Sequence, residues 1–190
     1  MARHALDGGA DLINDVSGLG DPEMLDVVVQ RGAGIVVSFN PSPPKTGPKM
    51  VVLDEPVEAG LSFFAERLTA LDAAGVGGDR VILDPGPDLG KSPWATVQIL
   101  RNLGLFRSYG RPLLLALSRK DFLGAVVRAA PLERDAALFG VLSALDLAST
   151  DILRVHDPRA VSDFYALRSV ADGSVDVQVD LELPADLRRI

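Results

Sequence analysis

The sequence predicts an α/β protein with a parallel sheet and helices outside it. Two observations carry this prediction. Short apolar stretches with little polar alternation recur along the chain, and such stretches are typical of strands buried on both faces. Longer amphipathic stretches separate them, so that strands recur at intervals of roughly 25 to 45 residues, as in right-handed β-α-β crossovers. Strands joined in this way are parallel, and their carboxyl ends lie at one edge of the sheet.

Cap and turn residues delimit the elements of the amino-terminal half. Asp21, with Pro22 after it, is a favoured start of a helix, and Gly32 ends that helix. Four prolines between residues 40 and 52 exclude a helix or a central strand, and this loop after a strand is a candidate lid. Apolar and aromatic side chains at helical spacing follow, and we expect them in the core. The expected elements are strands over 11–16, 34–39 and 81–84 and helices over 2–8, 21–32 and 53–74.

The carboxyl-terminal half repeats the alternation of strand and helix. Ser92 and Pro93 are a typical helix start, and the stretch 112–118 is almost wholly apolar. The expected elements are strands over 112–118 and 151–156 and helices over 92–103, 121–128, 132–149 and 158–170.

The last segment differs in pattern from the rest. Apolar and polar residues alternate strictly over 174–183, which predicts a strand with one apolar face and an acidic face. A lone strand is not stable in water, so we expect it to pair with an exposed strand edge or across a homodimer interface; a disordered tail is the alternative. We therefore predict a main domain over 1–171 and an extension over 172–190.

The stretch 81–91 is the most informative part of the chain. Its apolar strand ends in Asp84, and Pro85 and Gly86 follow at once. A carboxylate in this place is held on a stiff turn, which suits binding or catalysis. Asp is also a favoured turn and cap residue, so a purely structural role is an equal alternative from this stretch alone.

Composition excludes several classes of protein. The chain has 190 residues, 47% of them hydrophobic and 24% charged, as in a single globular domain. Without cysteine it can form neither a disulfide nor a thiolate metal site, and this fits a cytoplasmic protein. A net charge of −7 argues against a nucleic-acid surface. We find no apolar run that fits a membrane span and no signal peptide, so we expect neither nucleic acid nor membrane as a partner.

Polar residues interrupt or finish each of the expected strands. Because the carboxyl ends of parallel strands meet at one edge, these side chains are expected to converge on one site. Each has a structural alternative when taken singly, such as a capping Asn, an ion-paired Arg or a hydrogen-bonded His. The residues concerned are Asn14, Ser38, Asp84, Ser118, Arg154 and His156.

Four motifs, in order, resemble those of dihydropteroate synthase. They are GADLINDVSG at 9–18, LDPG at 83–86 with Gly-Lys at 90–91, LSRK at 117–120 with Phe-Leu-Gly at 122–124, and RVHD at 154–157. The resemblance covers about residues 2 to 170 and implies a pterin-binding barrel of the TIM type. Only the later five of the eight β/α units of that barrel are matched.

The resemblance implies a role for each matched residue. Asn14 and Asp84 are expected to hydrogen-bond the edge of the pterin ring, with Gly86 in the same binding turn. Lys120 is expected to contact the pterin. The remaining implied substrate contacts are Arg154 and His156 on the leaving pyrophosphate and Ser118 and Arg119 on the p-aminobenzoate side. Lys120, Arg154 and His156 are thus the catalytic candidates, since cations stabilise the charge that develops on a leaving pyrophosphate.

The sequence also departs from the family pattern. Nothing matches the first three strands, so the magnesium ion that the family implies lacks its usual ligand region. Ser-Phe-Asn at 38–40 replaces a His-Met pair, and Asp88 and Leu89 replace Gly-Phe. We expect a truncated chain, or half of an enzyme completed by an amino-terminal partner, that is inactive alone. The alternatives are a non-catalytic pterin-binding or regulatory relative and the pterin domain of a corrinoid-linked methyltransferase.

Overall fold

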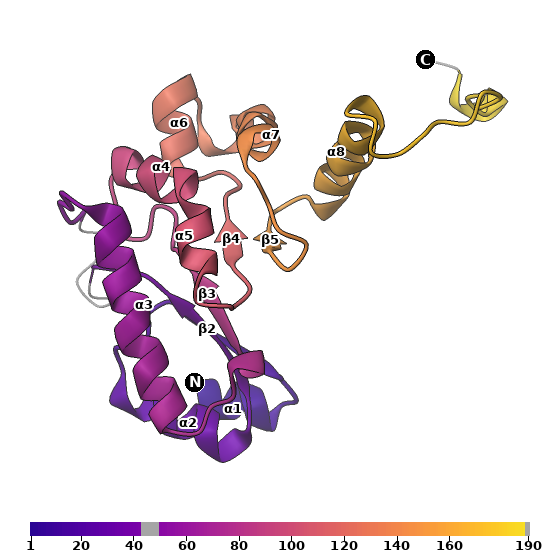
Figure 1. Cartoon of the computed structure of the whole chain (residues 1–190). Coiled ribbons are helices and arrows are strands. Elements are labelled where there is room, and N and C mark those ends of the chain that lie inside the picture. The colour runs from indigo at the N-terminus through magenta and orange to yellow at the C-terminus, as the bar shows by residue number, and fades with distance from the viewer. Residues whose placement is uncertain (43–49, 189–190) are drawn as a thin grey trace. The chain divides into compact units, whose positions relative to one another are not determined.

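The computed structural model describes residues 1–42 and 50–188. The chain divides into two compact units, Met1–Arg154 and Val155–Ile190. The first unit contains parallel strands with helices between them, which confirms the predicted α/β class (Figure 1). The bounds of its helices are α1 Ala2–Asp7, α2 Pro22–Arg31, α3 Pro56–Ala73, α4 Pro93–Arg101, α5 Leu103–Arg107, α6 Asp121–Val127 and α7 Asp135–Ala144.

Three strands form the first part of the sheet. They are β1 (Leu12–Asp15), β2 (Gly34–Ser38) and β3 (Val81–Asp84), paired in parallel with β2 in the middle. The register joins Asp15 to Val37 and Ser38 to Asp84. The apolar residues of β2 are fully buried, as expected for a central strand covered on both faces.

Two further parallel strands continue the same wall. They are β4 (Leu114–Ala116) and β5 (Ile152–Arg154). The backbone N–H of Leu83 donates to the carbonyl of Pro112 at 3.0 Å, and Leu83 also pairs with Leu113 in a parallel bridge. The five strands therefore lie in chain order with helices between them, which is the arrangement of part of a β/α barrel wall.

Local sequence signals explain where several helices begin. The side chain of Asp21 accepts a hydrogen bond from the backbone of Glu23, and the side chain of Ser92 accepts one from Ala95. Both helices carry proline in the first turn, where the missing N–H has no intrahelical partner in any case. Each predicted start is thus one residue from the observed one.

Aromatic side chains from distant segments form the core between α3 and the sheet, as predicted for this helix. Phe64 is fully buried and lies edge to face against Phe106, with 6.0 Å between the ring centroids. Phe39 and Phe63 extend the cluster, with ring centroids 5.2 Å apart. Gly60 permits this packing, because a Cβ atom there would lie 2.9 Å from Phe106.

Some predicted bounds were wrong. The helix expected over 92–103 is α4, which ends at Arg101, and a second helix that was not predicted, α5, follows after Asn102, whose amide donates to the carbonyl of Gln98 at 2.8 Å. Such side-chain bonding to the backbone competes with helix continuation. The helix expected over 132–149 extends only from Asp135 to Ala144, and strand β4 is shorter than expected. Most of the candidate lid over 40–52 lies outside the described residues; near its end Val51 pairs with Lys91.

The second unit contains helix α8 (Pro158–Ala171), capped by Asp157, whose side chain accepts from the backbone of Ala160. The strand predicted over 174–183 is wrong. The only regular element described after α8 is the short 3₁₀ helix η3 (Ala185–Leu187). The alternating pattern is present in the sequence, but Val179 is fully exposed, and within the described residues no strand pairs with this segment. A strand needs a partner for its backbone groups, so alternation alone does not form one.

Within the described ranges, no helix has the length and apolarity that a membrane crossing requires.

Candidate functional site

Asp84 lies at the carboxyl end of β3, and its side chain is held from two sides. Its Oδ2 accepts a hydrogen bond from the hydroxyl of Ser38 at 3.0 Å, and its Oδ1 accepts one from the backbone N–H of Gly86 at 2.8 Å. Burial raises the pKa of this carboxyl. The two hydrogen bonds oppose that rise, and so do the ammonium charges of Lys91 and Lys120. Asp84 is thus a buried, oriented acceptor at the predicted place.

Lys91 is a buried cation beside this carboxylate. Its ammonium donates to the backbone carbonyl of Phe39, to that of Gly86 at 2.8 Å and to that of Leu89 at 3.1 Å. It also lies over the ring of Phe39, 4.3 Å from the centroid. Burial lowers the pKa of Lys91 to about 7, against the favourable charge of Asp84. Lys91 therefore fastens the end of β2 to the turn that carries Asp84.

A second acid, Asp88, lies in the loop between β3 and α4. Its backbone is left-handed, with φ of 63°. Its carboxylate accepts a hydrogen bond from the backbone N–H of Phe122 at 3.2 Å and one from the hydroxyl of Thr96 at 3.3 Å. Burial raises the pKa of Asp88, while the bond from Phe122 and the charge of Lys120 oppose the rise. The loop after β3 is thereby joined to α6.

Ser118, Arg119 and Lys120 follow β4, as predicted. Ser118 is buried and Lys120 is half-buried at the N-cap position of α6. Arg119 has a left-handed backbone, with φ of 61°, and its Nε lies 3.4 Å from Oδ1 of Asp135. Its carbonyl accepts a hydrogen bond from Nη1 of Arg134 at 2.9 Å. The ion pair with Asp135, the first residue of α7, directs the Arg119 side chain toward that helix.

The electrostatic effects on these groups show that four charged side chains lie close to one another. Lys120 acts on Asp84, Asp88 and Lys91, and Lys91 is acted on by both acids. We call this group, Asp84, Asp88, Lys91 and Lys120, the charge cluster. It contains two acids and two lysines, so it is neutral when all four are ionised. Asp84 and Lys120 are residues predicted from the sequence, whereas Asp88 and Lys91 had no predicted role, although both lie in the stretch 81–91.

The strand register places two further predicted residues on the face of the sheet that carries Asp84. Asn14 pairs with Val36, which is followed two residues later by Ser38, the partner of Asp84. Since side chains alternate along a strand, Asn14 and Asp84 lie on one face. The bridge between Leu83 and Leu113 sets the register of β4, and Ala116 of β4 pairs with Arg154 of β5. Arg154 therefore lies on the same face as Asp84. Asn14 and Arg154 are exposed there.

His156 belongs to the second unit. Its side chain is exposed, and it directly precedes Asp157, the cap of α8. Its predicted role with pyrophosphate therefore stays a prediction.

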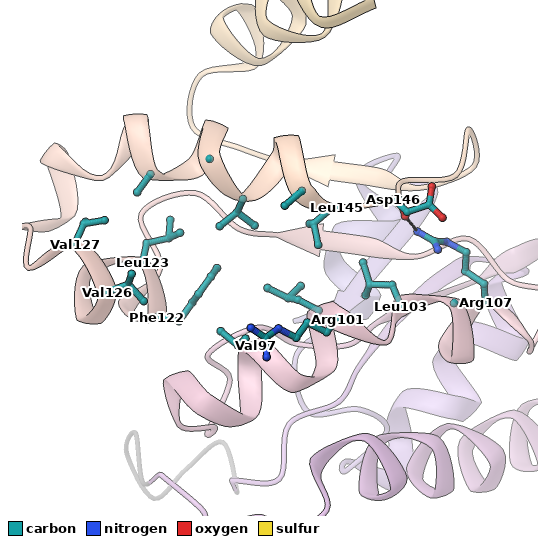
Figure 2. Close-up of a pocket in the computed structure, with 16 residues that line it drawn as sticks. Val97, Arg101, Leu103, Arg107, Phe122, Leu123, Val126, Val127, Leu145 and Asp146 are labelled. Carbon is teal, nitrogen blue, oxygen red and sulfur yellow. Dashed lines mark hydrogen bonds between the residues drawn. The ribbon is translucent and has the colours of Figure 1, made fainter. Parts of the chain in front are cut away.

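The chain also has an apolar groove of about 700 Å³ among α4, α5, α6 and α7 (Figure 2). Val97, Leu123 and Val126 are among the side chains that line it, and the guanidinium of Arg107 donates to the carbonyl of Asp146 at one end, at 2.6 Å. None of the four side chains of the charge cluster lines this groove. Ligand sites combine apolar walls with a few convergent polar groups, so the strand ends are the better candidate site.

The described residues do not by themselves form a cluster of metal ligands. Among residues 1–42 and 50–188 there is no group of three or more His, Cys, Asp or Glu side chains placed to hold a metal ion. Magnesium is usually held through one or two carboxylates together with waters and substrate phosphates, so the ion that the family implies stays an expectation.

Acids and cations thus lie at or shortly after the carboxyl ends of consecutive parallel strands, the edge at which α/β proteins bind their ligands. Residues 1–156 match the family described as pterin binding enzyme, and the chain belongs to that family.

Several proteins similar to this chain are named dihydropteroate synthase. The chain is 32% identical over 164 residues to the dihydropteroate synthase of Synechocystis sp., covering 85% of this chain and 57% of that protein. It is 36% identical over 165 residues to the inactive dihydropteroate synthase 2 of Mycobacterium leprae, covering 83% of this chain and 56% of that protein. The dihydropteroate synthase of Xanthomonas albilineans in complex with 7,8-dihydropteroate has a TM-score of 0.79 at 33% identity, covering 92% of this chain and 64% of that one. The chain thus spans a little more than half the length of these curated relatives.

Proposed function

We propose that this chain binds a pterin at the carboxyl end of β3 and takes part in joining p-aminobenzoate to 6-hydroxymethyl-dihydropterin pyrophosphate, with release of pyrophosphate. The observation that carries the proposal is the buried carboxylate of Asp84, held by Ser38 and Gly86 beside two lysines. The similarity to dihydropteroate synthases supports the choice of substrate class.

The chemistry of Asp84 suits the pterin edge. A pterin ring presents neighbouring N–H donors on its amide and amino groups. Each oxygen of Asp84 accepts one hydrogen bond from the protein, and a carboxylate oxygen can accept a second. The exposed amide of Asn14, on the same face of the sheet, supplies both a donor and an acceptor. Together they distinguish a pterin from a ring that lacks these donors.

The proposed reaction needs positioning and charge stabilisation rather than a protein nucleophile. The bond from the pterin methylene carbon to the pyrophosphate oxygen breaks, and pyrophosphate leaves with the electron pair. The amine of p-aminobenzoate forms the new bond to that carbon and then loses a proton. Lys120, at the start of α6, and Arg154, the last residue of β5, can stabilise the negative charge that builds on the leaving group. No step is assigned to a metal ion.

A second candidate function is pterin binding without turnover. The relative in Mycobacterium leprae that is named inactive is 36% identical to this chain, which favours this alternative. The buried Asp84 serves recognition in both functions, so binding and turnover must be measured separately.

The test uses the whole chain and 6-hydroxymethyl-dihydropterin pyrophosphate as the ligand in calorimetric titration. We expect the wild type to bind and Asp84→Asn to bind more weakly. Asp151→Asn is the matched control, because Asp151 is also a buried acid that accepts a backbone N–H and pairs with arginine, but it precedes β5 instead of following a strand. It should leave the affinity unchanged in the folded protein. Absence of binding by the wild type would refute the proposed function. Transfer of labelled p-aminobenzoate to the pterin would decide between turnover and binding alone.

A further inference from the structure

Helix α6 starts at the residue after Lys120, and its own sequence does not cap it. The N-cap residue of α6 is Lys120, and no side-chain cap bond comes from it. An ammonium can only donate hydrogen bonds, whereas the free N–H groups at a helix start need an acceptor. The first turn of α6 therefore receives no acceptor from the side chain of its N-cap residue.

Asp88 supplies that acceptor from a segment far away in sequence. Its Oδ2 accepts from the backbone N–H of Phe122, 34 residues further on, at 3.2 Å. Its own position is fixed by Thr96, because the backbone N–H of Asp88 donates to the Thr96 hydroxyl at 3.1 Å and that hydroxyl donates to Oδ1 of Asp88 at 3.3 Å. The carboxylate thus joins the loop after β3 to the turn that carries Lys120.

The backbone of Asp88 shows that this link has a cost. With φ of 63°, it adopts a left-handed conformation that glycine adopts readily and that Asp and Asn adopt at a smaller cost than other residues. Glycine at this position would remove the strain and would also remove the link. The carboxylate is partly buried, and burial raises its pKa, while the nearby charge of Lys120 opposes that rise.

We propose that Asp88 is a positioning residue for Lys120, because it ties the first turn of α6 to the loop that follows Asp84. This inference rests on the proposed function, in which Lys120 and Asp84 contact the same ligand. A ligand that must immobilise a freely moving lysine side chain binds more weakly than one that meets it already placed.

Two variants test the proposal in the whole chain. Asp88→Gly removes the acceptor, and we expect the affinity for 6-hydroxymethyl-dihydropterin pyrophosphate to fall about ten-fold. The melting temperature should change little, because loss of the cap is offset by relief of the left-handed backbone. Asp88→Asn keeps an acceptor for the N–H of Phe122 and tolerates this backbone conformation, so it should retain wild-type affinity. Weak binding by both variants alike would overturn the proposal.

A double-mutant cycle asks whether Asp88 acts through Lys120. In the Lys120→Met background the ligand no longer gains from a placed ammonium, so Asp88→Gly should cause no further loss of affinity. A second ten-fold loss in that background would show that Asp88 acts on the ligand by another route, and the positioning proposal would be wrong.

A measurement without ligand separates this proposal from the proposed function. The order parameter of the Lys120 side chain, measured by carbon relaxation, should fall in Asp88→Gly and remain at the wild-type value in Asp88→Asn. If the wild type fails to bind the pterin while this pattern holds, the proposed function is wrong and the positioning of Lys120 by Asp88 stands. Equal order in wild type and Asp88→Gly would overturn the positioning itself.

Discussion

Replacing Asp84 with Asn should separate ligand recognition from folding. The substitution preserves the size of the side chain and removes its charge. The amide oxygen can still accept from the backbone N–H of Gly86, and the amide nitrogen can donate to the hydroxyl of Ser38. Both protein contacts of Asp84 therefore survive in a folded variant.

The two effects on stability oppose each other. The amide removes the cost of burying a carboxylate, but Lys91 loses the favourable charge beside it. We expect the free energy of unfolding to change by less than about 1 kcal/mol. Ligand binding loses a charged hydrogen-bond acceptor, which corresponds to about 1–3 kcal/mol. That loss is roughly a 5- to 150-fold increase in Kd.

The assay is calorimetric titration of 6-hydroxymethyl-dihydropterin pyrophosphate at several pH values, with urea unfolding of the same samples. Burial raises the pKa of Asp84, so this carboxyl becomes protonated as the pH is lowered. The affinity of the wild type should therefore decrease at low pH. The Asn variant should lack that decline. Equal losses of stability and of affinity, or the same pH profile in both proteins, would assign Asp84 a structural role and refute the reasoning.

Four further substitutions test the interactions around the site and away from it. Burial lowers the pKa of Lys91 to about 7 in the folded protein, from 10.5 ordinarily, so between these pH values the unfolded chain binds more protons and this group makes the free energy of unfolding rise with pH. Lys91→Met should abolish that rise, measured by urea unfolding at pH 7 and pH 10. An unchanged dependence on pH would contradict the lowered pKa of Lys91. Gly86→Ala should lower the free energy of unfolding by more than about 2 kcal/mol, since φ is 66° there and the new Cβ would lie 2.4 Å from a carbonyl oxygen. The control Gly75→Ala, with φ of 77° and open space around it, should lower it by about 1 kcal/mol. Equal losses would exclude the collision at Gly86. Arg107→Leu leaves Asp151 buried without its ion-pair partner and should lose about 3–5 kcal/mol in thermal unfolding with ligand affinity intact; a weakened affinity would mean that this pair also supports the site.

The sequence alone determined the features of this protein that depend on neighbouring residues. The strands could be predicted from short apolar stretches, and the starts of α2 and α4 from a cap residue followed by proline. Asp84 could be placed at the end of a strand because a carboxylate followed by Pro-Gly ends an apolar stretch. Parallel strands bring their carboxyl ends together, so Ser38 and Asp84 could be expected at one edge before any contact was known.

Only the tertiary structure decided which of these residues touch, because their partners lie far away in the chain. Lys91 bonds the carbonyl of Phe39, 52 residues earlier, and Asp88 caps a helix 34 residues later; no local pattern encodes either contact. Residues 174–183 also show that a local pattern depends on distant partners. The alternating residues 174–183 satisfy the pattern of a strand, yet they do not form one, because a strand exists only where another backbone accepts and donates its hydrogen bonds.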